Sequence, residues 1–193
     1  MKKTERTTKM KHAIIVAGPE RSGTRLATEW CIQAGFDGVA TAEARPEFGG
    51  FSQKWDNELP ADEPRVVIRR SFPYHPDRKW CMIDELIKEL QEVRGYDVTV
   101  METFRHDFCV ASSQAKNNYV AGVMHGLVDI AKTRAMIADS VSLTSPNYVE
   151  FEYESFIRDS GEYTFHLCYR LGLKQFTFDG DLYNGNMKHY GLR

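Results

Sequence analysis

The segment VAGPERSGTRLATEW, residues 16–30, is the feature that most constrains the fold of this chain. It follows a short apolar run, AIIV at 13–16, and leads into a stretch whose apolar residues recur at helical spacing. Gly18 and Gly23 let the backbone turn tightly so that its N–H groups face inward, and the helix N-terminus adds about half a positive charge. The loop therefore predicts an anion site between a buried strand and a helix.

Apolar runs rich in β-branched residues alternate along the chain with longer stretches at helical spacing, which is typical of an α/β fold. The expected strands are 13–16, 66–70, 97–101 and 148–153. The first three are near-continuous apolar runs, as central parallel strands require. We predict a three-layer α/β/α domain around a mainly parallel central sheet. It would comprise residues 1–193, with 1–11 as a flexible N-terminus.

Helices are expected from about Arg25, over 77–95 and 118–134, and in a stretch that ends at Gly172. Three of them carry an apolar stripe that we expect to face the core, which in the last comprises Thr164, Leu167, Cys168 and Leu171. In 77–95 it comprises Trp80, Ile83, Leu86, Ile87, Leu90 and Val93, and in 118–134 it comprises Val120, Val123, Met124, Leu127, Val128 and Ala131. Asp77 would cap the first of these helices, and Gly95 would end it.

Composition narrows the class of protein. The formal net charge is −2, which favours neither nucleic acid nor an anionic membrane as a partner. The apolar run after the N-terminus is too short for a membrane span or a secretory signal. Cys31, Cys81, Cys109 and Cys168 are widely spaced, and the histidines show no metal-binding spacing. We therefore expect buried thiols in a reduced, cytoplasmic protein without a metal, a nucleic-acid partner or a membrane anchor.

The loop differs from that of a nucleotide hydrolase in the residues that do the chemistry. In the pattern GxxxxGK[ST], a lysine contacts the transferred phosphoryl group and a hydroxyl binds magnesium. Here Thr24 stands at the lysine position and Arg25 at the hydroxyl position. Arg21 supplies a cation inside the loop instead. The loop is thus suited to an anion whose transfer needs no magnesium.

Two motifs in this chain, PERSGTR at 19–25 and FRHDFCVASS at 104–113, resemble those of the PAPS-dependent sulfotransferases. PERSGTR at 19–25 is similar to their 5'-phosphosulfate loop, P[KR]SGT[TR]. FRHDFCVASS at 104–113 is similar to their 3'-phosphate element, R-x-P-x-D-x-x-x-S, with Arg105 and Ser113 eight positions apart and Asp107 in place of the proline. A guanidinium can grip a phosphate by two bonds, and a hydroxyl on the following helix can bind a third oxygen.

The resemblance extends in the same order over roughly residues 13–173. VVIRRSFP at 66–73 stands where many members have a strand followed by KTHLP, and 151–173 resembles their C-terminal strand-and-helix unit. It implies a P-loop NTPase-like sulfotransferase architecture and PAPS as co-substrate. It also implies nucleotide-binding roles for Arg21, Ser22, Gly23, Thr24, Arg25, Arg69, Arg105 and Ser113. Arg21 would in addition be catalytic, because it would reach the bridging oxygen on which negative charge grows.

A sulfotransferase also needs a base to take the proton of its acceptor. Ser71 stands where the family has the histidine of KTHLP, so another residue must serve. Some members use a glutamate soon after the helix of the loop, which makes Glu43 the first choice, and His75 is the second. The acceptor would be a hydroxyl or amine of a small molecule, carbohydrate or peptide. Two alternatives remain open: a nucleoside or small-molecule kinase, and a nucleotide-binding protein without turnover.

Overall fold

The computed structural model describes residues 11–38, 63–73, 83–180, 182 and 184–189. Its strands form one parallel sheet in the order β2-β3-β1-β4-β5. The strands are β1 Lys11–Pro19, β2 Asp37–Gly38, β3 Arg65–Phe72, β4 Tyr96–Phe104 and β5 Asn147–Glu152. Because β1 lies at the centre with β3 and β4 on either side, the loop that follows it emerges between two neighbouring strand ends.

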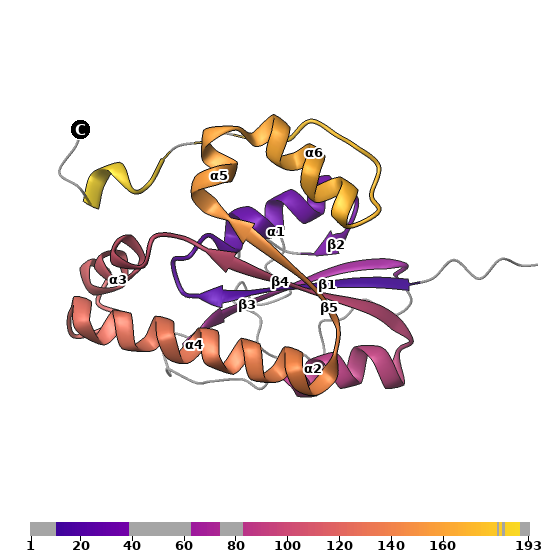
Figure 1. Ribbon diagram of the computed structural model, residues 1–193, viewed down its shortest axis with the longest axis horizontal. Coiled ribbons are helices and arrows are strands. Elements are labelled where there is room, and N and C mark those ends of the chain that lie inside the picture. The colour runs from indigo at the N-terminus through magenta and orange to yellow at the C-terminus, as the bar shows by residue number, and fades with distance from the viewer. Residues whose placement is uncertain (1–10, 39–62, 74–82, 181, 183, 190–193) are drawn as a thin grey trace, which may run out of the picture.

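Helices cover both faces of this sheet (Figure 1). They are α1 Thr24–Gln33, α2 Ile83–Lys88, η3 Glu89–Val93, α3 Asp107–Lys116, α4 Val123–Thr144, α5 Tyr153–Arg158, α6 Ser160–Arg170 and η4 Met187–His189. The helices α1, α5 and α6 lie on one face, and α2 and α4 lie on the other (Figure 1). The predicted three-layer α/β/α architecture with a mainly parallel sheet is confirmed.

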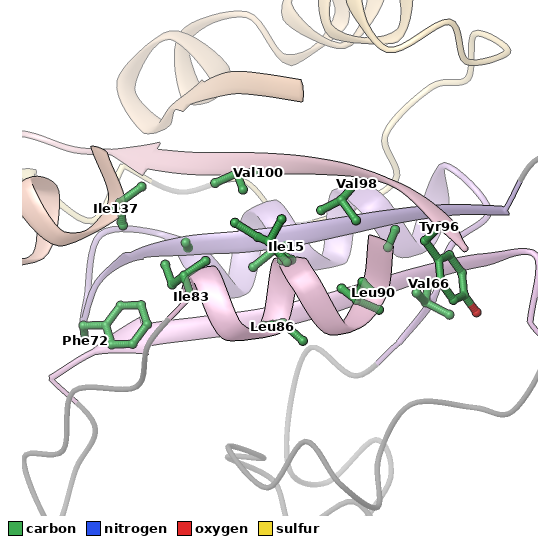
Figure 2. Packing of buried hydrophobic residues seen from close by; sticks show 13 residues of the cluster. Ile15, Val66, Phe72, Ile83, Leu86, Leu90, Tyr96, Val98, Val100 and Ile137 are labelled. Carbon is green, nitrogen blue, oxygen red and sulfur yellow. The ribbon is translucent and has the colours of Figure 1, made fainter. Parts of the chain in front are cut away.

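Each face of the sheet has its own apolar core. The face towards α2 and α4 is drawn in Figure 2, where Ile15 and Val100 of the sheet meet Leu86 of α2 and Ile137 of α4. On the other face, Trp30 of α1 belongs to a cluster of buried residues from the strands and from α1, α5 and α6. Both cores share β1, whose middle residues are wholly buried. This double burial explains why its sequence is a continuous apolar run.

The stripe predicted for 77–95 is correct except at one end. Ile83, Leu86, Ile87 and Leu90 are buried, whereas Val93 is 72% exposed. The helix changes at Glu89 to a π-helical turn that runs to Val93. A π turn contains one more residue than an α turn, so Val93 is rotated away from the stripe. Gly95 has φ of 69°, as predicted for the end of this helix, while Asp77 and Trp80 lie outside the described residues.

The stripe predicted for 118–134 is wrong in part. The helix begins only at Val123, continues to Thr144, and leaves Met124 and Val128 71% and 64% exposed. The residues buried on α4 are Gly126, Asp129, Ile130, Thr133, Ile137 and Ser140. Gly126 sets this face, because a Cβ there would lie 2.9 Å from the Cα of Ala111 on α3. A close helix–helix contact through a glycine leaves no apolar signal in the sequence.

Candidate functional site

The loop after β1 presents backbone N–H groups at the N-terminus of α1. Arg21 and Gly23 both have positive φ, 74° and 104°. The helix has no side-chain N-cap, and in the described part of the chain the N–H groups of Gly23, Thr24 and Arg25 have no acceptor. Unpaired N–H groups at a helix N-terminus form a site for an anion. The turn and the helix expected from the sequence are present, and binding of an anion there stays a prediction.

Contacts with β4 fix the start of this loop. The hydroxyls of Ser22 and Thr103 lie 2.5 Å apart, and that of Thr103 also donates to the carbonyl of Ala17 at 3.4 Å. A Cβ at Gly18 would lie 2.1 Å from Thr103 Oγ1, so only glycine permits this approach. The loop is therefore packed against the end of the neighbouring strand.

Two further contacts tie the loop to other elements. The hydroxyls of Thr24 and Ser71 lie 2.7 Å apart, which links α1 to the end of β3. Gln114 of α3 donates from Nε2 to the carbonyl of Glu20 at 2.8 Å. Strand ends on both sides and one helix thus hold the loop, so its N–H groups have a fixed direction.

Arg105 brings the two predicted anion-binding elements into contact. Its Nη1 donates a hydrogen bond to the carbonyl oxygen of Arg21 at 3.0 Å, and its Nε donates to Asn186 Oδ1 at 2.6 Å. The guanidinium lies over the ring of Tyr153, with its central carbon 4.6 Å from the ring centroid. The side chain thus faces the loop, and the elements around Arg21 and Arg105 are in contact.

Arg21 and Arg105 each have a buried donor that no described residue satisfies. Arg21 donates from Nη2 to the hydroxyl of Tyr119 at 3.1 Å and lies over that ring, but its Nε has no acceptor. Arg105 Nη2 likewise has none. An unpaired buried donor of a charged group is costly, and an anion with several oxygens would satisfy both guanidiniums.

Arg25 and Arg69, which were also predicted to bind the nucleotide, lie in different surroundings. The side chain of Arg25 is 66% exposed and pairs with Glu29 at 2.9 Å, so only its backbone N–H joins the cradle. Arg69 lies within β3, three residues before Phe72 ends the strand, and close to the charges of Glu20, Arg25 and Glu29. Burial lowers the pKa of its guanidinium, and Glu20 partly offsets this effect.

Ser113 lies on the buried side of α3, but no contact between its hydroxyl and Arg105 is present among the described residues. Its side chain is buried next to Gln114, and it is Gln114 that reaches the loop. The carbonyl of Ser113 accepts from the side chain of Asn117 at 2.7 Å. The structure therefore joins α3 to the loop through the residue after the predicted one.

Both candidate bases, Glu43 and His75, lie outside the described residues. Of the cysteines, Cys31, Cys109 and Cys168 are buried free thiols, as predicted, and Cys81 is outside the described residues. Within 11–38, 63–73 and the later described ranges, no three His, Cys, Asp or Glu side chains come together as a metal site. No helix in the same ranges has the length and apolar character of a membrane span.

Beyond Arg105, a cavity of about 450 Å³ opens at the ends of β4 and β5. Its lining is Phe104, Arg105, His106, Asp107, Arg134, Glu150, Glu152 and Glu154. Arg134 binds the Asp107 carboxylate through two hydrogen bonds of 2.6 and 3.2 Å. The lining of the cavity therefore contains four carboxylates and two guanidiniums, and one of the two guanidiniums, that of Arg134, is already paired with Asp107.

The sequence analysis did not identify several residues that shape the site, namely Thr103, Gln114, Tyr119, Tyr153 and Asn186. Thr103 and Tyr153 stand at the carboxyl ends of β4 and β5, where side chains of parallel sheets meet. That position could have singled them out. Tyr119 and Asn186 lie outside strands and α-helical stripes, and nothing in the local sequence marks them.

No known protein-family profile and no curated protein match this sequence. Among solved structures, the sulfotransferase domain from the Synechococcus PCC 7002 olefin synthase is similar, with a TM-score of 0.57 and 16% identity. The match covers 91% of this chain and 80% of that domain. The fold is sulfotransferase-like. At this identity the similarity concerns the fold alone, so a function has to rest on the residues around Arg21 and Arg105.

Proposed function

We propose that this protein is a sulfotransferase that moves the sulfonyl group of PAPS to a hydroxyl or amine acceptor and releases 3',5'-ADP. The hydrogen bond from Arg105 Nη1 to the carbonyl of Arg21 carries the proposal. It brings together two guanidiniums, each with a buried donor that no described residue satisfies, beside a helix N-terminus that has no side-chain cap in the same part of the chain. This arrangement suits a molecule with two separate anionic groups, such as a 3',5'-bisphosphorylated nucleotide.

Each residue has a distinct task in this proposal. The N–H groups of Gly23, Thr24 and Arg25 would hold the 5'-phosphosulfate, and Arg105 would bind the 3'-phosphate. As the bond between sulfur and the bridging oxygen breaks, charge grows on that oxygen, and Arg21 would stabilise it there. A donor that acts on developing charge typically contributes about 3–4 kcal/mol to transition-state stabilisation. The leaving nucleotide carries the charge, so the reaction would need no metal.

The acceptor must lose its proton as its oxygen or nitrogen bonds to sulfur. We propose Glu43 as the base that receives this proton, with His75 as the second choice. A positioned base contributes roughly 10²- to 10⁴-fold to the rate. Glu43→Gln should therefore lower the transfer rate by a factor in this range while leaving the affinity for 3',5'-ADP unchanged. Equal rates for Glu43→Gln and the parent protein would move the role to His75.

Thermal unfolding with nucleotides tests the proposal. In EDTA, 3',5'-ADP should raise the melting temperature of the parent protein and of Arg170→Ala, whose side chain is exposed on α6. The shift should be lost in Arg105→Ala. If ATP with magnesium stabilises the protein and 3',5'-ADP does not, the proposal is wrong and a kinase is the better description.

Transfer of label from PAPS to phenols, sugars and peptides separates an enzyme from a binding protein. Turnover with at least one class of acceptor is expected. Stoichiometric binding of PAPS without transfer to any of them would indicate a nucleotide-binding protein without turnover.

A further inference from the structure

The guanidinium of Arg105 is oriented by residues beyond the predicted nucleotide loop. An arginine side chain has five N–H donors in a rigid fork. In this structure Nε donates to Asn186, Nη1 donates to the carbonyl of Arg21, and the plane lies over Tyr153. The buried Nη2 has no acceptor among the described residues. The contact with Asn186 thus leaves the edge of the guanidinium at Nη2 available for a ligand.

Asn186 stands between a group that only donates and a group that only accepts. Its Oδ1 accepts from Arg105 Nε, and its Nδ2 donates to Glu154 Oε1. The same oxygen of Glu154 accepts from the backbone N–H of His106 at 2.9 Å, just before α3. Because the guanidinium has no acceptor and the carboxylate no donor, the amide fits in one orientation. The side chain is 4% exposed, so this fit is protected from water.

The short segment that carries Asn186 is fixed to the site by Tyr153. The N–H of Gly185 donates to the hydroxyl of Tyr153 at 3.0 Å, and the N–H of Asn186 is held by Asn184 Oδ1 at 3.0 Å. The ring of Tyr153 approaches Gly23 so closely that a Cβ there would lie 3.0 Å from Cδ2. In Figure 1 the C-terminal segment reaches the end of the sheet near α3. Residues 184–186 are thus connected both to the loop and to Arg105.

We propose that Asn186 is a positioning residue that makes the site specific for a nucleotide with a 3'-phosphate. It holds Arg105 Nε, so the fork presents Nη2 to the ligand. This inference rests on the proposed function, which assigns the 3'-phosphate to Arg105. When Asn186 is removed, Nε loses its acceptor, and the fork is held less firmly, by Nη1 and by the ring of Tyr153. Affinity for 3',5'-ADP then falls, whereas affinity for 5'-AMP, which has no 3'-phosphate, changes little.

The test is the ratio of the Kd values for 5'-AMP and 3',5'-ADP, measured by calorimetry. Asn186→Ala should weaken 3',5'-ADP binding roughly tenfold, which corresponds to one hydrogen bond to a charged group. Binding of 5'-AMP should change less than about twofold. Asn147→Ala is the matched control, because Asn147 lies at the end of β5 that is away from Arg105 and donates there to Asp97. The control should keep the ratio of the parent protein.

A double-mutant cycle distinguishes positioning from a general structural role. If Asn186 acts through Arg105, adding Asn186→Ala to Arg105→Ala costs no further affinity. Tyr153→Phe, which keeps the ring and loses the bond to Gly185, should change the ratio in the same direction and by less. This second variant tests the inference even where Asn186→Ala does not fold.

Three outcomes would overturn the inference. They are equal weakening of both nucleotides by Asn186→Ala, additive losses in the double mutant, and a parent-like ratio in both Asn186→Ala and Tyr153→Phe. In each case the parent protein still prefers 3',5'-ADP, so the proposed function survives. A parent protein that binds neither nucleotide would instead overturn the proposed function together with this inference.

Discussion

Arg105 Nη1 donates a hydrogen bond to the backbone carbonyl of Arg21 at 3.0 Å, although the two residues are 84 positions apart in the chain. The carbonyl belongs to a residue with φ of 74°, an uncommon backbone conformation for a residue other than glycine. The contact brings the end of β4 to the loop after β1. It therefore brings the two arginines together, and each retains a buried donor that has no acceptor among the described residues.

Arg21 in the loop and Arg25 in the first turn of α1 are close in the chain but should differ strongly in their effect on sulfonyl transfer. Arg21→Ala should lower the single-turnover rate by roughly 10²- to 10³-fold, because the side chain would act on charge that develops in the transition state. Arg25→Ala should change it less than about threefold, since its side chain is exposed and forms a surface ion pair. Equal losses in the two variants would contradict these assignments.

Gly18→Ala should destabilise the fold and disturb the loop. The added Cβ would lie 2.1 Å from Thr103 Oγ1 and 2.8 Å from Ser22 Oγ, so these side chains would have to move. We expect a loss of about 1–3 kcal/mol in the free energy of unfolding, measured with urea. Gly161→Ala is the control, because its Cβ meets only an ordinary contact of 3.6 Å and its site is helical. The control should be neutral or slightly stabilising.

The hydroxyl pair of Ser22 and Thr103 should behave as one unit. Thr103→Val leaves the Ser22 hydroxyl buried without its partner, which costs about 1–3 kcal/mol. Adding Ser22→Ala removes that unpaired group, so the double variant should be less destabilised than the sum of the single ones. Urea unfolding of all four proteins measures the coupling. Additive losses would show that the two hydroxyls do not depend on each other.

Glu102 should make stability decrease with rising pH. It is buried on β4 and accepts from the hydroxyl of Tyr148 at 2.8 Å. Burial raises the pKa of its carboxyl, and the bond from Tyr148 and the charge of Arg134 only partly offset this. The neutral acid is favoured in the folded state, so its contribution is present below the unfolded pKa and is lost as pH rises through the folded one.

Glu102→Gln keeps an acceptor for Tyr148 and removes the ionisation. Its free energy of unfolding should therefore fall less than that of the parent protein between pH 4 and 7.5, measured by urea at each pH. Glu85→Gln, at an exposed position on α2, should follow the parent protein. Parallel pH profiles for Glu102→Gln and the parent protein would show that this carboxyl does not titrate differently on folding.

Part of the site could be predicted because its signals are local. The turn around Gly18 and Gly23 and the helix behind it are properties of adjacent residues, so the turn and the helix were correctly expected, and the anion that they would hold stays a prediction. Arg105 was predicted at a strand end from a resemblance of motifs, and the structure places it beside the loop. The roles proposed for these residues stay predictions until nucleotide binding is measured.

Other features of the fold could not be predicted, because they depend on contacts between elements that are distant in the sequence. Val93 leaves its stripe because of a single π turn, and Met124 is exposed because α4 packs through Gly126. The strand β2, only two residues long, has too little pattern to be predicted. In each case the packing of neighbouring elements decided the outcome, and periodicity along one segment contains no information about it.

The amino-acid sequence by itself determined the four longer strands, where the chain turns at glycine, and which loop leads into a helix N-terminus, because these depend on neighbouring residues. Only the tertiary structure decided that Tyr119 contacts Arg21 and that Asn186 and Tyr153 orient Arg105. These partners lie 98, 81 and 48 positions away from the arginines they contact. Their contacts arise when the parallel sheet brings strand ends and the C-terminal segment to one edge, which no local pattern encodes.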